Sequence, residues 1–155
     1  MRTGIGFDAH RFDEQRPLVL GGVVIEGAPG LAGHSDGDAL THAVIDALLG
    51  AATLGDIGTH FPSDDERWRG ARSVDLLAGV AGLLQARGHA IGNVDATVIA
   101  ERPRLAGHID RMRGALAAAM GIDAARVSVK ATTTDGLGFT GRGEGIAALA
   151  VALIE

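Results

Sequence analysis

The sequence predicts a fold that combines β-strands with α-helices, and three observations indicate it. Residues 2–12 alternate between two faces as a strand does, and apolar residues over 40–51 follow the spacing of one helix face. A hairpin pattern over 17–25 turns near Gly21-Gly22. The length of 155 residues predicts a single domain over residues 1–155 that buries a core of its own.

The central helix begins within a loop of short polar residues, where Ser35 or Asp36 is the expected N-cap and Asp38 the anion of the first turn. Asp38, His42 and Asp46 are spaced by four residues and form a polar line along the helix. A histidine with a carboxylate one turn away on each side is a candidate metal ligand. An ordinary solvated helix face would give the same pattern.

Asp8 and His10 project from one face of the first strand, so both can be ligands of the same metal ion. Together with His42 they form a candidate set of two histidines and one carboxylate, which leaves a fourth zinc position open for catalysis. Asp46, one turn from His42, is a candidate to orient its ring. The alternative is two unrelated polar clusters.

The rest of the chain continues the alternation of helices and strands. We expect helices over 71–87 and 108–120 and strands over 91–100, 127–133 and 145–154. The last segment is apolar on both faces, which is typical of a strand covered on both sides. In so short a chain, the second cover is expected to come from another subunit.

Composition excludes several classes of protein and site. A net charge of −5 argues against nucleic acid as a partner, and the absence of cysteine excludes disulfides and thiolate metal sites. The N-terminus has no apolar leader and no apolar run approaches the length of a membrane span. We therefore expect a cytoplasmic protein without a membrane partner.

Two motifs near the C-terminus are weak when taken alone. Gly136–Gly141 matches G-x-G-x-x-G, but the chain ends too soon for the helix, second strand and acid of a dinucleotide fold. Thr132–Asp135 ends a strand with hydroxyls and a carboxylate, which could hold phosphate and a hard divalent cation. Strand propensity alone also explains the threonines.

Taken together, the motifs of the chain point to one family. In chain order they are Gly6-Phe-Asp-x-His10, Gly21-Gly22-Val, His34-Ser-Asp-Gly-Asp38, His42, Asp46-Ala-Leu-Leu-Gly-Ala-Ala, Leu54-Gly-Asp-Ile-Gly58, Phe61-Pro, Gly92-Asn-Val-Asp95, Val129-Lys-Ala-Thr-Thr-Thr134 and Gly138-Phe-Thr-Gly-Arg-Gly-Glu-Gly145. With these motifs the chain resembles the 2-C-methyl-D-erythritol 2,4-cyclodiphosphate synthase family over essentially its full length.

The resemblance implies a lyase of the non-mevalonate isoprenoid pathway. Such an enzyme converts 4-diphosphocytidyl-2-C-methyl-D-erythritol 2-phosphate to the 2,4-cyclodiphosphate and releases CMP. The 2-phosphate attacks the β-phosphorus of the diphosphate within one substrate molecule, so catalysis consists of positioning and charge neutralisation.

The resemblance also implies cofactors and an assembly. Each subunit would bind one zinc ion through Asp8, His10 and His42, and Asp135 would hold a second cation, magnesium or manganese, at the diphosphate. The implied fold is an α+β two-layer sandwich, a mixed β-sheet with helices packed on one face. It forms a homotrimer with active sites between chains, whose central cavity could take an isoprenoid diphosphate near Phe7, Phe139, Arg142 and Glu144.

Residue by residue, the match assigns His34 and Thr133 to stabilising the transition state. The residues that it places around the substrate are Asp8, Ala9, His10, His34, Ser35, Asp56, Ile57, Gly58, Phe61, Pro62, Ser63, Asp64, Asp65, Ala100, Glu101, Arg102, Pro103, Arg104, Leu105, Ala106, Ala131, Thr132, Thr133, Thr134, Asp135, Phe139 and Arg142. Three sites depart from the family: Arg104 replaces a lysine, Asp135 a glutamate, and Ser63-Asp64 an Asp-Thr pair.

Two other functions fit the same residues. A zinc-dependent phosphohydrolase would use the three ligands with a metal-bound water and release a linear product. A trimeric nucleotide- or isoprenoid-binding module without catalysis would hold its metal through four protein ligands, and the sequence offers no convincing fourth.

Overall fold

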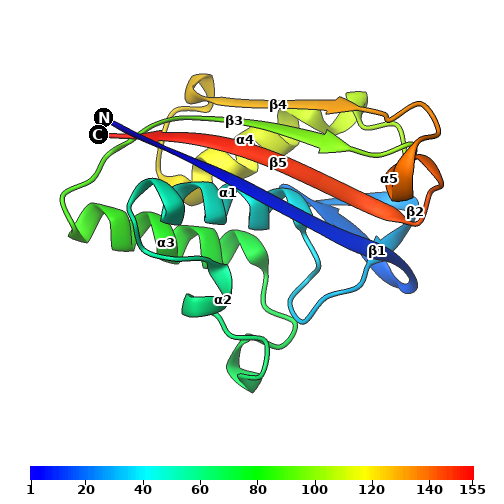
Figure 1. Ribbon diagram of the computed structural model, residues 1–155, viewed down its shortest axis with the longest axis horizontal. Helices are drawn as coiled ribbons and strands as arrows, with labels where there is room; N and C mark the ends of the chain where they lie inside the picture. Colours follow the sequence, from blue (N-terminus) through cyan, green and yellow to red (C-terminus); the bar gives the residue numbers. More distant parts are fainter.

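A mixed five-stranded sheet with the order β2-β1-β5-β3-β4 forms one layer of the protein (Figure 1). The computed structural model describes residues 1–155. Neighbouring strands are antiparallel except for the parallel pair β3 and β4. The strands are β1 (Arg2–Leu20), β2 (Val23–Leu31), β3 (Ile91–Ile99), β4 (Val127–Thr132) and β5 (Gly145–Ile154).

Helices form the second layer, with α1 against β1 and β5 and with α3 and α4 beside it (Figure 1). The helices are α1 (Ala39–Ala51), α2 (Ile57–His60), α3 (Ser73–Ala86), α4 (Ile109–Met120) and α5 (Gly138–Gly141), with 3-10 turns η1 (Glu66–Trp68), η2 (Ala106–His108) and η3 (Ala124–Arg126). The α+β class and the mixed sheet expected from the sequence are confirmed.

The two layers touch most closely where α1 crosses β1. A Cβ atom on Gly6 would lie 2.0 Å from the carbonyl oxygen of Ala43, and one on Gly4 would lie 2.1 Å from that of Ala47. Real Cβ atoms do not approach backbone so closely, so only glycine fits at either position. Every second residue of β1 faces α1, and Asp8 and His10 continue the row that Gly4 and Gly6 begin.

The outer face of the sheet carries apolar side chains that nothing in the chain covers. Ile5 is 67% exposed and Phe7 57% on β1, and Leu149 and Val151 of β5 are also exposed. The expectation that β5 is apolar on both faces is confirmed, since its inner residues from Ile146 to Ile154 belong to the core. No helix in the structure combines the length and apolar character needed to cross a membrane.

The N-cap expected at Ser35 or Asp36 is wrong, because α1 is capped by Asp38. The Asp38 carboxylate accepts from Thr41 N at 2.9 Å and also from the backbone N–H groups of Gly21, at 2.9 Å, and Gly22, at 2.7 Å. Asp38 is fully buried, and three backbone donors satisfy its oxygens there. The tertiary contact with the β1–β2 turn decides which residue becomes the cap.

We predict that Gly6→Ala lowers the free energy of unfolding by about 3 kcal/mol or more, because the new methyl group would meet backbone rather than a flexible side chain. Gly79→Ala is the control. Gly79 lies in α3, where a methyl group would have no atom within 4 Å, so alanine should add about 1 kcal/mol through helix propensity. Urea unfolding of both variants measures the difference, and equal stabilities would contradict the close contact.

Candidate metal centre and its pocket

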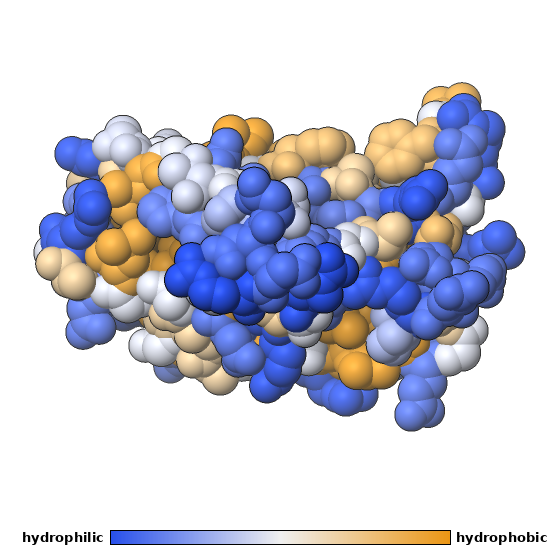
Figure 2. Space-filling view, turned by 90° about the horizontal axis from the view of Figure 1, so that it is seen from below, coloured by the Kyte–Doolittle hydropathy of each residue, from blue (hydrophilic) through white to orange (hydrophobic).

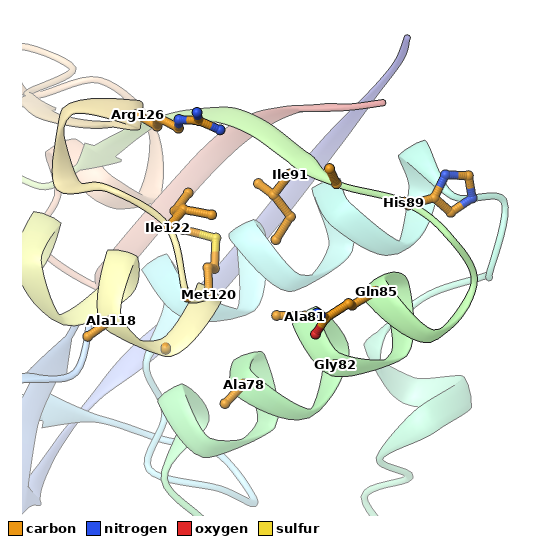
Figure 3. Close-up of a pocket in the computed structure, with 13 residues that line it drawn as sticks. Ala78, Ala81, Gly82, Gln85, His89, Ile91, Ala118, Met120, Ile122 and Arg126 are labelled. Atoms are coloured by element: carbon orange, nitrogen blue, oxygen red, sulfur yellow. The ribbon is translucent and has the colours of Figure 1, made fainter.

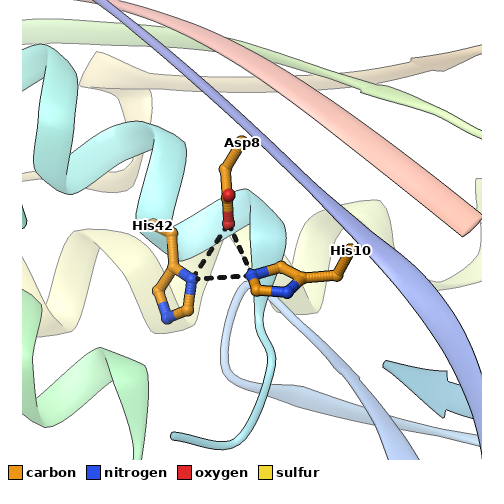
Figure 4. A group of neighbouring side chains, drawn as sticks. All are labelled: Asp8, His10 and His42. Atoms are coloured by element: carbon orange, nitrogen blue, oxygen red, sulfur yellow. Dashed lines mark hydrogen bonds and ion pairs between the residues drawn. The ribbon is translucent and has the colours of Figure 1, made fainter. Parts of the chain in front are cut away.

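Three side chains from two elements meet at one point between the layers (Figure 4). Asp8 Oδ2 lies 2.8 Å from His10 Nε2 and 3.0 Å from His42 Nδ1. The two ring nitrogens are 3.2 Å apart. These atoms form a group that could hold a divalent metal ion, and no other acid or histidine joins it.

The far nitrogen of the His42 ring contacts two serine hydroxyls. Ser73 Oγ lies 2.8 Å from His42 Nε2, and Ser35 Oγ lies 3.0 Å from it. Asp46 does not orient this ring, contrary to the sequence prediction. Its carboxylate instead accepts from the backbone N–H of Ile57 at 2.7 Å, so it fixes the start of α2, where an unpaired donor needs an acceptor.

Charge and burial shift the pKa values of the cluster. Burial raises the pKa of Asp8, but hydrogen bonds from His10 and His42 outweigh this and hold it well below the usual value. Burial lowers the pKa of His42, but the hydrogen bond to Asp8 and the charges of Asp8, Asp38 and Asp36 outweigh this and raise it. Without metal, a proton therefore binds where the cation would bind, and the two compete.

The centre opens into a pocket of about 240 Å³. Its lining brings together residues that the sequence analysis assigned to the same site from separate segments: Asp8, His10, His34, Ser35, His42, Ile57, Gly58, Phe61 and Ser63. Trp68 and Leu76 also line it and were not predicted. Trp68 is the chain's one tryptophan, packed edge-on against Phe61 with ring centroids 5.0 Å apart, and nothing in its spacing indicated the pocket.

Other residues expected at this site lie beside the pocket without lining it. Asp56 caps α2 by accepting from Thr59 N at 2.8 Å, and Asp65 pairs with Arg67 at 2.5 Å. The Asp65 carbonyl oxygen lies 3.2 Å from His34 Nε2, which ties the loop to the pocket wall. Ala9, Pro62 and Asp64 are likewise outside the lining. The face with α2 and η1 is mainly hydrophilic (Figure 2).

A second group of predicted residues gathers around the ends of β3 and β4. The segments 100–106 and 131–135 are joined by a hydrogen bond from Ala100 N to Thr132 O of 3.0 Å. Glu101 Oε1 accepts from Thr134 N at 3.2 Å and from Gly136 N at 3.1 Å. Thr133 Oγ1 donates to Asp135 Oδ1 at 3.1 Å. The structure therefore builds a second cluster of backbone groups, hydroxyls and a carboxylate.

The second cluster is separate from the metal centre within one chain. Asp8 pairs with Ala148, Ala148 with Val98, and Val98 with Ala131. Three strand spacings correspond to about 14 Å. None of the residues 100–106 or 131–135 lines the pocket of the metal centre. Phe139 and Arg142 are outside it too, and Arg142 Nε pairs with Glu144 at 2.6 Å.

A larger cavity of about 460 Å³ lies between α3, α4 and the start of β3 (Figure 3). It is lined mostly by small and apolar residues such as Ala78, Ala81 and Ile122, with Arg126 and His89 at its polar parts. The larger cavity contains none of the candidate site residues, and the candidate site is identified by its metal-ligating group instead of by its size.

The fold and the site together define a class of protein, an α+β metal-binding enzyme. Its helices pack on one face of a mixed sheet, and two histidines and a carboxylate line its pocket. The model of the YgbB family matches residues 1–155, and the chain belongs to this family. The relative from Alkaliphilus oremlandii named 2-C-methyl-D-erythritol 2,4-cyclodiphosphate synthase is 56% identical over 154 residues, which is 99% of this chain and 98% of that protein.

Solved structures agree with this assignment. The bifunctional IspDF of Campylobacter jejuni superposes with a TM-score of 0.95 at 44% identity, over 99% of this chain and 42% of that longer chain. A 2C-methyl-D-erythritol-2,4-cyclodiphosphate synthase in a CDP-bound form superposes with a TM-score of 0.90 at 39% identity, over 99% of this chain and 100% of that chain. The family expected from the sequence is confirmed.

We predict that Asp8→Asn destabilises the metal-free protein most between about pH 4 and pH 6.5. The lowered pKa of Asp8 gives stability above its unfolded-state value that is lost as the pH falls. The raised pKa of His42 gives stability below its unfolded-state value that is lost as the pH rises through the folded-state value. Denaturant unfolding with a chelator, from pH 4 to pH 9, measures the difference from wild type, and a difference independent of pH would contradict the pairing.

Proposed function

We propose that the chain is a 2-C-methyl-D-erythritol 2,4-cyclodiphosphate synthase, which closes its substrate into the cyclodiphosphate and releases CMP. The observation that carries the proposal is the metal-ligating group of Asp8, His10 and His42 at the base of a pocket, in a chain 56% identical over nearly its full length to synthases of that name. The cytoplasmic location expected from the sequence stays a prediction.

The donor set fits zinc. Donor spacings of 2.8 to 3.2 Å are close to the roughly 3.3 Å that separates ligands about 2.0 Å from a tetrahedral zinc ion. Three protein ligands leave one position for a substrate oxygen, which is typical of a catalytic rather than a structural site. When bound, the zinc ion would act as a Lewis acid that holds phosphate oxygens.

The remaining residues act on the substrate by position. His34 and Ser35 lie in the wall of the pocket beside the metal ligands, where they can donate to the attacking phosphate. Phe61 and Trp68 form an apolar edge that excludes water from the reacting groups. Displacement within one substrate molecule needs no protein nucleophile, and orientation supplies much of the rate.

The second cluster is proposed as the nucleotide half of the site. The backbone groups of 100–106 and the hydroxyls of Thr132 and Thr133 are proposed to bind a cytidine diphosphate. Asp135 is proposed to hold magnesium or manganese at the diphosphate. A solved relative is titled as a bound form with CDP, which supports the ligand class. Arg104 keeps the charge of the family's lysine but presents a wider, planar group.

The separation of the two halves favours a homotrimer with each site between chains. The uncovered apolar face, with Ile5, Phe7, Leu149 and Val151, provides a surface that a neighbouring chain would bury. Around the threefold axis, Phe7, Phe139 and the ion pair Arg142–Glu144 are proposed to border a central cavity that takes an isoprenoid diphosphate.

We predict that the wild-type protein with zinc and magnesium turns the cytidyl substrate into a cyclic product and CMP, as followed by phosphorus NMR. His10→Ala should lose zinc, and its activity should fall by a factor of about 100 or more. The His10 side chain is more exposed than that of His42, so its removal disturbs packing less.

The product distinguishes the two enzyme alternatives. A linear product that has gained water would identify a phosphohydrolase and contradict the cyclase. Zinc binding without turnover would indicate a binding module. Normal activity and full zinc content in His10→Ala would remove this residue from the metal site.

We predict that two inactive variants restore activity when co-assembled. His10→Ala disables the metal half, and Thr133→Val with Ala131→Phe disables the nucleotide half. In randomly mixed trimers, an intact metal half meets an intact nucleotide half in about one site in four under cyclic symmetry.

Activity of co-expressed, doubly tagged trimers measures this recovery. Because every such trimer contains both variants, about one site in three should be active in the purified mixed trimers, compared with about one in four in the unselected mixture. Each variant alone is the control, and variants mixed after purification, without subunit exchange, should remain inactive. Mixed trimers no more active than the parents would show that both halves of a site come from the same chain.

A further inference from the structure

The ring nitrogen of His42 that faces away from Asp8 and His10 belongs to a chain of hydrogen bonds. This chain runs through Ser73 and Asp36, neither of which is in the metal-ligating group. Ser73 Oγ lies 2.8 Å from His42 Nε2, and the same hydroxyl donates to Asp36 Oδ1. Ser73 is fully buried and His42 is 8% exposed. Bulk water therefore has little access to these groups, and the protein alone satisfies the ring nitrogen.

The proton positions in this chain follow from what each group can do. A carboxylate only accepts, so the single hydroxyl proton of Ser73 goes to Asp36. The lone pairs of Ser73 Oγ then remain to accept a proton from His42 Nε2. In the metal-free protein, a protonated His42 ring also donates from Nδ1 to Asp8 Oδ2, 3.0 Å away. A metal ion held by Asp8, His10 and His42 would displace that proton, and with the other proton kept on Nε2 the lone pair of Nδ1 would face the metal position.

The Asp36 carboxylate is held in position because it also caps the N-terminus of α3. Helix α3 begins at Ser73, and the residue before it, Arg72, makes no side-chain cap hydrogen bond. Asp36 Oδ2 instead accepts from Ser73 N at 2.9 Å, and the Asp36 N–H donates to Ala71 O at 3.0 Å. One carboxylate from the loop before α1 thus caps α3 and orients the Ser73 hydroxyl.

We propose that Ser73, held by Asp36, is a positioning residue that keeps His42 in the tautomer and orientation that binds metal through Nδ1. The inference rests on the metal centre proposed above. Ligating histidines generally donate their second ring N–H to a fixed acceptor, and loss of that acceptor lowers metal affinity by about 10- to 100-fold. Ser35 Oγ, at 3.0 Å, is a second neighbour of the same nitrogen, but no carboxylate takes its proton.

The test compares zinc binding by Ser73→Ala, Asp36→Asn and the control Ser35→Ala. Ser73→Ala removes the hydroxyl but keeps the backbone N–H that Asp36 caps. Asp36→Asn keeps the volume, but its amide can donate to Ser73 and turn the hydroxyl proton toward His42. Both should raise the zinc dissociation constant about 10- to 100-fold in competition with a chelator, and Ser35→Ala should raise it clearly less.

A second readout separates positioning from a loss of stability. In the zinc-loaded wild type, the Nε2–H proton of His42 should give a downfield, slowly exchanging NMR signal, and in Ser73→Ala it should move upfield and exchange faster. Melting temperatures of the metal-free proteins control for folding, and Asp36→Asn decides the matter if Ser73→Ala does not fold.

The outcomes are distinct. A wild type that binds no zinc would overturn the metal centre itself. A wild type that binds zinc, with Ser73→Ala equal to it in affinity and in the His42 signal, would overturn the positioning role. Equal losses in Ser73→Ala and Ser35→Ala would also overturn it, since the carboxylate behind Ser73 would then have no effect.

Discussion

The contact between the backbones of β1 and α1 is the constraint on which the rest of the structure depends. Gly4 and Gly6 let the helix lie directly on the strand, with no side chain between them. At this separation, the short side chain of Asp8 and the ring of His42 meet within hydrogen-bonding distance. A thicker layer of side chains would leave the ligands too far apart to share one ion.

Most of the buried polar side chains lie around this contact, and their hydrogen bonds are made to other groups of the protein. Asp38, Thr41, His42 and Ser73 are buried, and each has at least one hydrogen-bond partner. Unpaired groups in such a place would cost about 1–3 kcal/mol each. The metal centre is therefore built on a polar network that connects the hairpin, α1 and α3, and the open pocket lies on its outer side.

Much of the fold and of the site could be predicted from the sequence, because local patterns encode them. The Gly21-Gly22 turn follows from the hairpin pattern around the glycine pair, and the row of Asp8 and His10 follows from strand periodicity. The end of α4 at Gly121, which is left-handed, follows from the conformational freedom of glycine. The predictions for the N-cap of α1 and for the partner of Asp46 were wrong, because contacts with residues farther away in the chain decide both. Asp38 bonds to Gly21 and Gly22, and Asp46 bonds to Ile57. Ser73 was not noticed, since a lone serine at a helix start carries no signal until the fold brings it to His42.

The bonds from Asp38 to the backbone of Gly21 and Gly22 have a consequence for how the molecule opens. The residue that caps α1 also anchors the turn between β1 and β2, so the turn cannot peel away without exposing the first turn of the helix. Local fluctuations of the turn and the helix are thereby coupled, and hydrogen exchange at this partly buried hairpin turn should be as slow as in the first turn of α1. Three ligands from two elements would open and close as one cooperative unit.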